Sequence, residues 1–97
     1  MIGCLKKIKV IPGKEQEFEY LLNQLKAQVA LHEPGNEYYD LYKSSTESGV
    51  YIMMERYHDT AALEMHEQSV HGAQFFPELR SLVSSLEKEC FESVDLT

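Results

Sequence analysis

The sequence predicts an α+β fold in which helices pack on a four-stranded antiparallel sheet. Three observations predict it: a hairpin-like pair of strand segments at 38–43 and 50–57, helical periodicity before and after this pair, and strand-like segments near each end of the chain, at 4–11 and 91–96. The resulting order is βαββαβ. Because 97 residues provide one modest core, we expect a single domain over residues 1–97.

The composition is that of an ordinary globular chain, with 43% hydrophobic and 26% charged residues. The net charge of -7 argues against nucleic-acid binding, which needs clustered Lys and Arg. We find no apolar run long enough to cross a membrane and recognise no secretory leader. P-loop, dinucleotide-binding, nucleophile-elbow and CxxC motifs are also absent, which disfavours nucleotide-dependent chemistry and a serine hydrolase. We therefore expect a cytoplasmic protein with no nucleic-acid or membrane partner.

The first strand, residues 4–11, ends at the turn signal Pro12-Gly13. Because side chains alternate along a strand, Lys6 is the one charge on a face that it shares with Cys4, Ile8 and Val10. Its stem can lie over apolar neighbours while the ammonium reaches water. Alternatively, Lys6 is a cation at a pocket edge that stabilises an anion.

The two cysteines, Cys4 and Cys90, are too few for a disulfide framework. We expect them to be buried free thiols in a reducing cytosol. The first and last strands of a βαββαβ sheet are neighbours, so contact between the two cysteines stays open. Nothing in the sequence requires a disulfide.

A helix of about five turns is expected at residues 14–31, ended by Pro34-Gly35. Its apolar residues fall on one stripe at helical spacing: Phe18, Leu21, Leu22, Leu25 and Val29. This is a core helix without an evident chemical role.

The second hairpin strand is apolar on both faces over residues 50–54. A strand that is apolar on both faces must be covered on both faces. The helices of so short a chain can cover one face of the sheet. We therefore expect the sheet of a second copy to cover the other, in a symmetric homodimer.

After the hairpin, Asp59 is placed to cap a short helix that begins at Thr60. A further helical stretch is expected, with Pro77 either opening a separate helix or kinking a longer one. Its apolar residues are Phe75, Phe76, Leu79, Leu82, Val83 and Leu86. Residues 91–96 then form the last strand, which completes a ferredoxin-like split βαββαβ unit.

Three histidines, His58, His66 and His71, lie close together in the sequence. His66 shares a helix face with Leu63 and should point toward the sheet, either as a core histidine or as a general base. A five-residue spacing does not place His66 and His71 on one helix face, so we predict no metal site. A helix break could still bring them together with Glu55 or Glu67.

Glu55 is an acid within an otherwise apolar strand, on the face that also carries Tyr51, Met53 and Tyr57. It can pair with a cation, such as Lys6 or Lys7 of the first strand or an arginine of a second copy, or it can serve as a perturbed base. The six tyrosines and four phenylalanines suit an aromatic pocket, and they are also ordinary sheet filling.

Three stretches of the sequence, in order, resemble the antibiotic-biosynthesis monooxygenase (ABM) domain family. Residues 10–18, VIPGKEQEF, resemble the family's strand end followed by PGKE-x-E-F. Residues 33–42 are similar to its EPG-x-x-x-YDLY stretch. Residues 55–71 follow E-R-[WY]-x-D-x-x-AL-x-x-H-x-x-S-x-H. The resemblance covers about residues 5–90.

The resemblance implies a dimeric α+β barrel, two ferredoxin-like sheets packed face to face, with each pocket between a sheet and its own helices. Known members include monooxygenases that oxidise quinols or polycyclic phenols with O2 without flavin or metal, haem-degrading enzymes, and an enzyme that processes phosphorylated autoinducer-2. His66 and His71 match the family's two histidines. The EPGN stretch and Tyr57, which stands where Trp is commoner, lean slightly toward the autoinducer-2 group. The sequence contains no Trp, and Lys6 lies near a position that is Asn in the haem-degrading branch; these two departures argue against haem degradation.

We therefore expect a small dimeric, cofactor-independent monooxygenase that oxidises a quinol or phenolic small molecule. His66 would be the base, and Lys6 or Tyr51 would stabilise the resulting anion. The residues expected to contact substrate are His71, Met53, Glu55, Tyr57, Phe75 and Leu79. Two alternatives remain: processing or isomerisation of a small phosphorylated signal such as autoinducer-2, and a non-catalytic dimeric ligand-binding module.

Overall fold

The computed structural model describes residues 1–96 and contains four strands and three helices. In chain order they are β1 (Ile2–Val10), α1 (Glu15–His32), β2 (Asn36–Lys43), β3 (Val50–Tyr57), α2 (Thr60–Glu67), α3 (Val70–Ser81) and β4 (Val83–Glu92). The strands form one antiparallel sheet in the order β2-β3-β1-β4. The predicted α+β class and ferredoxin-like strand arrangement are therefore confirmed.

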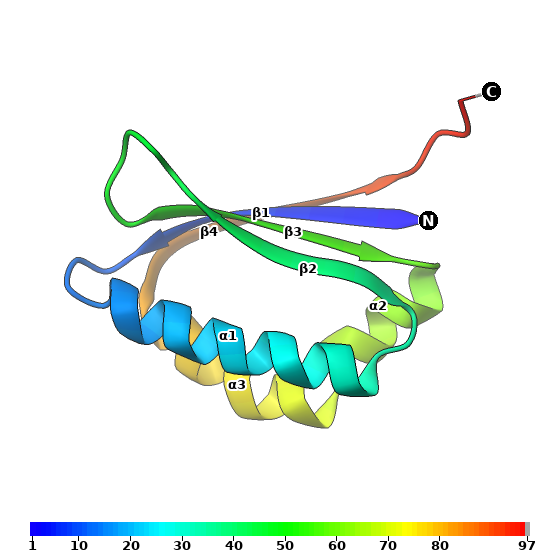
Figure 1. Cartoon of the computed structure of the whole chain (residues 1–97), viewed down its shortest axis with the longest axis horizontal. Helices are drawn as coiled ribbons and strands as arrows, with labels where there is room; N and C mark the ends of the chain where they lie inside the picture. The colour runs from blue at the N-terminus through cyan, green and yellow to red at the C-terminus, as the bar shows by residue number, and fades with distance from the viewer. Residues whose placement is uncertain (97) are drawn as a thin grey trace.

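The helices all lie on one side of the sheet, and no element within residues 1–96 covers the other side (Figure 1). Helices α1 and α3 pack side by side, while α2 lies at the end of the sheet where β3 finishes. Within residues 1–96, no helix combines the length and the apolar character needed to span a membrane. The core and the candidate site both lie between the sheet and the helices.

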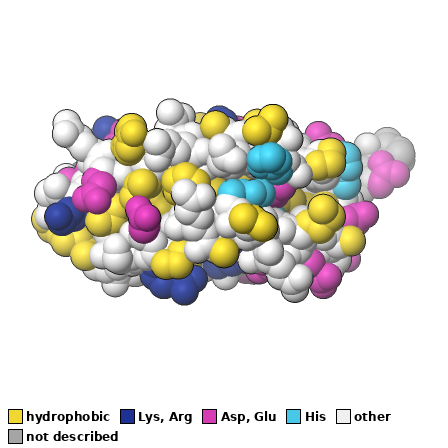
Figure 2. Space-filling model, turned by 90° about the horizontal axis from the view of Figure 1, so that it is seen from below, with side chains coloured by type: hydrophobic (Ala, Val, Ile, Leu, Met, Phe, Trp, Pro, Cys, Tyr) yellow, Lys and Arg dark blue, Asp and Glu magenta, His cyan; other side chains and the backbone are white. Residues whose placement is uncertain are grey.

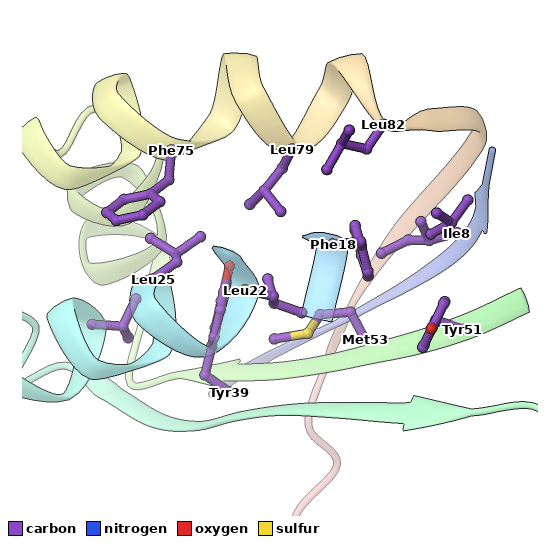
Figure 3. Packing of buried hydrophobic residues seen from close by; sticks show 12 residues of the cluster. Ile8, Phe18, Leu22, Leu25, Tyr39, Tyr51, Met53, Phe75, Leu79 and Leu82 are labelled. Carbon is purple, nitrogen blue, oxygen red and sulfur yellow. The ribbon is translucent and has the colours of Figure 1, made fainter. Parts of the chain in front are cut away.

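The core is formed by the face of the sheet that the helices cover (Figure 3). On α1 the expected apolar stripe is buried, with Leu21 only partly so. On β3 the face that carries Tyr51, Met53, Glu55 and Tyr57 is buried, as the alternation predicted. The cluster comprises Ile8, Val10, Phe18, Leu22, Leu25, Val29, Tyr39, Tyr51, Met53, Phe75, Leu79 and Leu82.

The last strand differs from the prediction. Helix α3 ends at Ser81, and β4 begins at Val83 rather than at residue 91. The Ile11 amide donates to the Leu82 carbonyl at 2.9 Å, and Val83 to Glu92 then pair with the free edge of β1. The expected helical placement of Val83 and Leu86 is therefore wrong. A nine-residue central strand needs partners for its backbone groups on both edges, and residues 91–96 alone could not supply them.

The expectation of two free thiols is also wrong, because Cys4 and Cys90 are joined by a disulfide. The reason is register: with β4 starting at Val83, Cys90 stands directly opposite Cys4 in the β1–β4 ladder. Directly opposite side chains in an antiparallel pair are close enough to interact. The two cysteines therefore give no reason to place the protein in a reducing compartment.

The second crossover consists of two helices rather than one. Helix α2 ends at Glu67, and α3 starts after the N-cap Ser69, whose Oγ accepts from the Gly72 amide at 3.0 Å. Pro77 lies inside α3, so it does not open a separate helix. The break at residues 68–69 matters for the site, because it changes the direction of the chain between His66 and His71.

The predicted cap at the start of α2 is confirmed, since Asp59 Oδ1 accepts from the Ala62 amide at 2.8 Å. We expect Asp59→Ala to lower the free energy of unfolding by about 1 kcal/mol, because a backbone donor of the first turn loses its partner. Urea denaturation would measure the loss. Asp59→Asn, which keeps a capping oxygen, is the matched control and should retain most of the stability. A full loss in the Asn variant would contradict the capping explanation.

Candidate active site

His66 is the centre of a buried polar cluster. It lies in the last turn of α2 and is only 2% exposed. Its Nδ1 atom lies 3.0 and 2.9 Å from the two carboxylate oxygens of Glu33. Glu33 is the residue that ends α1, where its own amide donates to the Val29 carbonyl. One end of α1 and one end of α2 therefore meet through a single side-chain pair.

Gly35 permits this meeting. A Cβ atom at this position would lie 2.6 Å from the Ala62 Cβ, closer than two carbon atoms can approach. The Gly35 carbonyl also accepts from the His58 amide at 2.9 Å. Because Ala62 is four residues before His66, the contact sets α2 against the turn that follows Glu33. Any side chain at Gly35 would push α2, and with it His66, away from Glu33.

His71 joins the same carboxylate. Its Nε2 atom lies 2.5 Å from Glu33 Oε2. Five residues along a continuous helix would separate His66 and His71, but the break between α2 and α3 turns both rings toward Glu33. From the sequence, we expected that a helix break could bring the two histidines together with Glu55 or Glu67. The structure adds Glu33, which the sequence analysis did not select as a site residue, and its only signal was its place in the matched EPG stretch.

A second carboxylate, Glu55, lies on the other side of His66. Glu55 Oε1 accepts from the Tyr57 hydroxyl at 2.6 Å and lies 3.7 Å from His66 Nε2. Glu55 Oε2 lies 2.8 Å from Lys6 Nζ, so the predicted ion pair between Glu55 and a first-strand lysine is confirmed. The ammonium approaches this oxygen outside ordinary hydrogen-bond geometry, and the contact is therefore electrostatic.

The contact with Glu33 indicates which nitrogen carries the proton when the His66 ring is neutral. An ionised carboxylate only accepts, so the neutral ring that bonds Glu33 through Nδ1 has its proton there and its lone pair on Nε2. Within residues 1–96, the buried Nε2 atom has no hydrogen-bond partner. Buried polar atoms are rarely left without one. The arrangement is therefore that of a histidine ready to accept a proton or a hydrogen bond at Nε2.

A cavity of about 460 Å³, lined in part by the His66 side chain, lies between the sheet and helices α1 and α3. Its walls combine apolar side chains with a polar end formed by His66, Tyr39 and Lys6. Two further cations, Arg80 and Lys88, are on its lining, and Lys88 pairs with Glu67 at 3.2 Å. A mostly apolar pocket with a few convergent polar groups is the usual form of a small-molecule site.

The candidate residues from the sequence separate into two groups. His66, Lys6 and Leu79 line the cavity. The other candidates do not line it. Tyr57 and Glu55 are buried behind His66 and support it. The residues that lie elsewhere are His71, Met53, Phe75 and Tyr51. His58 lies outside the cluster, where it is exposed and pairs with Glu37 at 2.7 Å.

Tyr51 and Tyr39 differ in a way that the sequence could not indicate. The Tyr51 hydroxyl donates to Glu19 Oε2 at 2.5 Å, and burial together with this bond raises the Tyr51 pKa. Tyr39, from β2, extends toward the helices with its hydroxyl away from the sheet (Figure 3), and its ring centroid lies 5.3 Å from that of His66. Burial and the nearby Glu55 and Glu33 charges raise the Tyr39 pKa, so this hydroxyl stays protonated at neutral pH.

The sequence model of the antibiotic biosynthesis monooxygenase (ABM) family matches residues 1–78. The chain belongs to this family. The curated relative named "Putative monooxygenase YcnE", from Bacillus subtilis (strain 168), is 33% identical over 85 residues, which are 88% of each protein. A crystal structure described as a putative antibiotic biosynthesis monooxygenase, from Caulobacter crescentus CB15, has a TM-score of 0.92 at 32% identity, over 97% of this chain and 90% of that one. A conserved protein from Methanosarcina mazei Go1 has a TM-score of 0.87 at 28% identity, over 96% and 92% of the two chains.

The matched part of this ABM chain contains the whole polar cluster. Glu33, Glu55, His66 and His71 all lie within residues 1–78, and β4 lies beyond them. The family resemblance drawn from the sequence motifs is thus confirmed. The substrate of this ABM protein has to be inferred from the chemistry of its own cavity.

Proposed function

We propose that this protein is a monooxygenase that oxidises a quinol or phenolic small molecule with O2, with His66 as the base. The observation that carries the proposal is the buried Nε2 atom of His66, which lacks a hydrogen-bond partner within residues 1–96 and belongs to a side chain that lines the cavity. A histidine whose Nδ1 is held by a carboxylate and whose Nε2 is free has the arrangement of a general base. Family membership supports the reaction class.

In the proposed reaction, His66 Nε2 takes the proton of a phenolic hydroxyl. The phenolate spreads its charge onto a ring carbon, which forms a bond to O2 and becomes a hydroperoxide after receiving a proton. The O–O bond and the remaining C–H bond at that carbon then break, giving a carbonyl group and water. One oxygen atom enters the product and the other leaves as water. All four electrons come from the substrate, so the reaction needs no external reductant.

Two cavity residues are suited to stabilise the phenolate. Lys6 supplies a cation and Tyr39 supplies a hydroxyl that remains protonated, and both line the cavity beside His66. Preorganised cations and donors placed where negative charge develops lower the barrier for such steps. We assign the donor role expected of Tyr51 to Tyr39, because the Tyr51 hydroxyl is already bonded to Glu19. Glu33 is a positioning residue that holds the proton on Nδ1 of His66.

The decisive experiment is oxygen uptake by metal-stripped protein with a panel of quinols and polycyclic phenols. We expect one O2 consumed per quinone formed, and one atom of 18O2 recovered in the product. Uptake that yields hydrogen peroxide with no label in the product would assign a two-electron oxidase instead. No uptake with any substrate of the panel would argue against the proposal.

A second function is favoured by one observation, the presence of Arg80 and Lys88 on the cavity lining together with Lys6. Three cations beside a base also suit a small phosphorylated substrate whose carbonyl is enolised. Such an isomerisation needs no O2. Turnover of a phosphorylated sugar-like compound under anaerobic conditions would therefore separate this function from the first. Saturable binding without turnover of either kind would instead indicate a ligand-binding module.

We further propose that the chain forms a symmetric homodimer through the uncovered face of its sheet. Apolar side chains gather there: Leu5, Tyr38, Tyr42, Ile52, Met54 and Phe91. Leu5 is 40% exposed, and Met54, directly opposite it on β3, is 36% exposed. A second sheet packed on this face would bury these side chains, as the doubly apolar β3 requires.

The proposed dimer interface can be tested with a matched pair of substitutions. We expect Leu5→Glu to convert a dimer into an 11.2 kDa monomer in analytical ultracentrifugation, because the charge would be buried at the interface. Leu31→Glu is the control, since Leu31 is 72% exposed on α1, on the helical side. The control should stay dimeric. A dimer that persists in Leu5→Glu, or a monomeric unmodified protein, would contradict the proposed interface.

A further inference from the structure

We propose that Glu33, His66 and His71 also form a binding site for a divalent transition-metal ion of the zinc class, and that the bound ion prevents His66 from acting as a base. The site itself follows from the geometry of the three side chains. Its inhibitory effect rests on the function proposed above.

The three side chains offer one carboxylate oxygen and two imidazole nitrogens, the donors that zinc prefers together with thiolates. All are buried, with exposed fractions of 7% for Glu33, 2% for His66 and 8% for His71. Their ligand atoms lie within 4.8 Å of one another. Zinc bonds of about 2.0–2.2 Å place tetrahedral ligand atoms about 3.4 Å apart. Each imidazole nitrogen therefore has to move away from Glu33 Oε2, now 2.9 Å from His66 and 2.5 Å from His71, by less than about 1 Å. Any pair of ligand atoms near the 4.8 Å limit has to close by about 1.4 Å, a rearrangement within the reach of side chains.

Metal and substrate would reach His66 from different sides. A hollow of about 590 Å³ is lined by Glu33 and His71 but not by His66, and the substrate cavity is lined by His66 but by neither of the other two. His32 also lines this hollow, and its ring stacks on that of His71 at 5.8 Å. Figure 2, which looks onto the helical side, shows histidine side chains gathered at this surface. The hollow supplies an entry path and room for a water as fourth ligand.

Metal binding and base function exclude each other for a chemical reason. The contact with Glu33 fits a neutral metal-free His66 ring whose Nδ1 donates to the carboxylate and whose Nε2 keeps the lone pair. A metal ion takes a lone pair, so Nδ1 must give up its proton to coordinate. The neutral ring then carries its proton on Nε2, which turns from an acceptor into a donor. This change of tautomer would stop proton abstraction from the substrate.

Binding can be measured on tag-free protein without any substrate. We expect isothermal titration calorimetry with Zn²⁺ to give one ion per chain, and Co²⁺ to give the intense visible absorption of a four-coordinate site. His71→Gln and Glu33→Gln, which nearly keep side-chain volume, should each weaken Zn²⁺ binding at least tenfold. His58→Ala removes an exposed histidine outside the cluster and should bind Zn²⁺ as the unmodified protein does. Equal affinity in all four proteins, or no binding, would overturn the proposal.

The tautomer provides a second measurement that needs no variant. The chain has four histidines, and long-range ¹H–¹⁵N correlation spectra report which ring nitrogen of each carries the proton. We expect the proton of His66 to be on Nδ1 in metal-free protein and on Nε2 after Zn²⁺ is added. Zn²⁺ that binds without changing this tautomer would overturn the switch.

Inhibition is tested last. One equivalent of Zn²⁺ should abolish oxygen uptake in the unmodified protein, and a chelator should restore it. His71→Gln should need at least ten times more Zn²⁺ for the same inhibition. If metal-free protein shows no uptake while the titration and the tautomer change occur, the metal site stands and the oxygenase proposal fails. Uptake that persists with the site filled would overturn the inhibitory role.

Discussion

Replacing His66 with alanine is expected to lower kcat for quinol or phenol oxidation by about 10²- to 10⁴-fold, the usual contribution of a general base. The physical reason is that Nε2 of His66 is buried without a hydrogen-bond partner within residues 1–96, whereas the Lys6 and Arg80 side chains on the cavity lining offer donors and no acceptor. Steady-state oxygen uptake would measure the change. Most of the loss should fall on kcat, since the apolar walls that bind the ring are unchanged.

The alanine variant removes a buried side chain and disturbs Glu33, so its fold must be checked by circular dichroism and by the oligomeric state. His66→Gln, which fills more of the space, provides a second test of the same role. His58→Ala is the matched control and should retain full activity, because the His58 side chain is exposed and pairs with Glu37, outside the cluster. Full-rate uptake in a folded His66→Gln protein would remove this residue from the mechanism.

The second large effect concerns stability. We expect Lys6→Met to lower the free energy of unfolding by about 3 kcal/mol, because it leaves the Glu55 carboxylate without its cation. Glu55 is 1% exposed and Lys6 lies 2.8 Å from it. The loss falls at the lower end of the range for buried pairs because the Lys6 side chain is 17% exposed, and water can reach it. Urea denaturation at a fixed protein concentration would measure it.

Two further variants isolate the ion pair. Lys26→Met breaks an exposed pair with a similar 2.9 Å distance, to Asp40, and should cost less than about 1 kcal/mol. The double variant Lys6→Met with Glu55→Gln removes both charges and should recover part of the lost stability. Equal losses for Lys6→Met and Lys26→Met would mean that burial of Glu55 does not set the cost.

The local sequence pattern is sufficient to predict the buried face of α1 and the bounds of β3. The stripe from Phe18 to Val29 is regular over about three turns, and the burial of α1 follows it. Strand β3 has the predicted bounds, since Gly49 and the residue after Tyr57 limit it on both sides. Gly49 adopts a φ of 77°, a conformation that glycine accepts without strain, and so the turn before β3 is encoded locally.

Near the end of the chain, the local sequence pattern predicts a helix where the structure has a strand. Leu79, Leu82, Val83 and Leu86 have helical spacing, yet the last two lie in β4. The free edge of β1 outweighs that spacing, because backbone groups at the centre of a sheet need partners on both edges. The disulfide was missed for the same reason, since its partners face each other only in the register that starts at Val83.

The sequence by itself determined the order of the four strands, the buried face of α1 and β3, and the family, and it named His66 and Lys6 as candidate site residues. Only the tertiary structure decided that Glu33 holds both His66 and His71, and that Tyr39 rather than Tyr51 lies at the cavity. Glu33 is 33 residues from His66 and 38 from His71. Such distant partners leave no periodic signal. They meet because Gly35 lets α2 approach the end of α1 and because the chain breaks between α2 and α3, and both are consequences of packing.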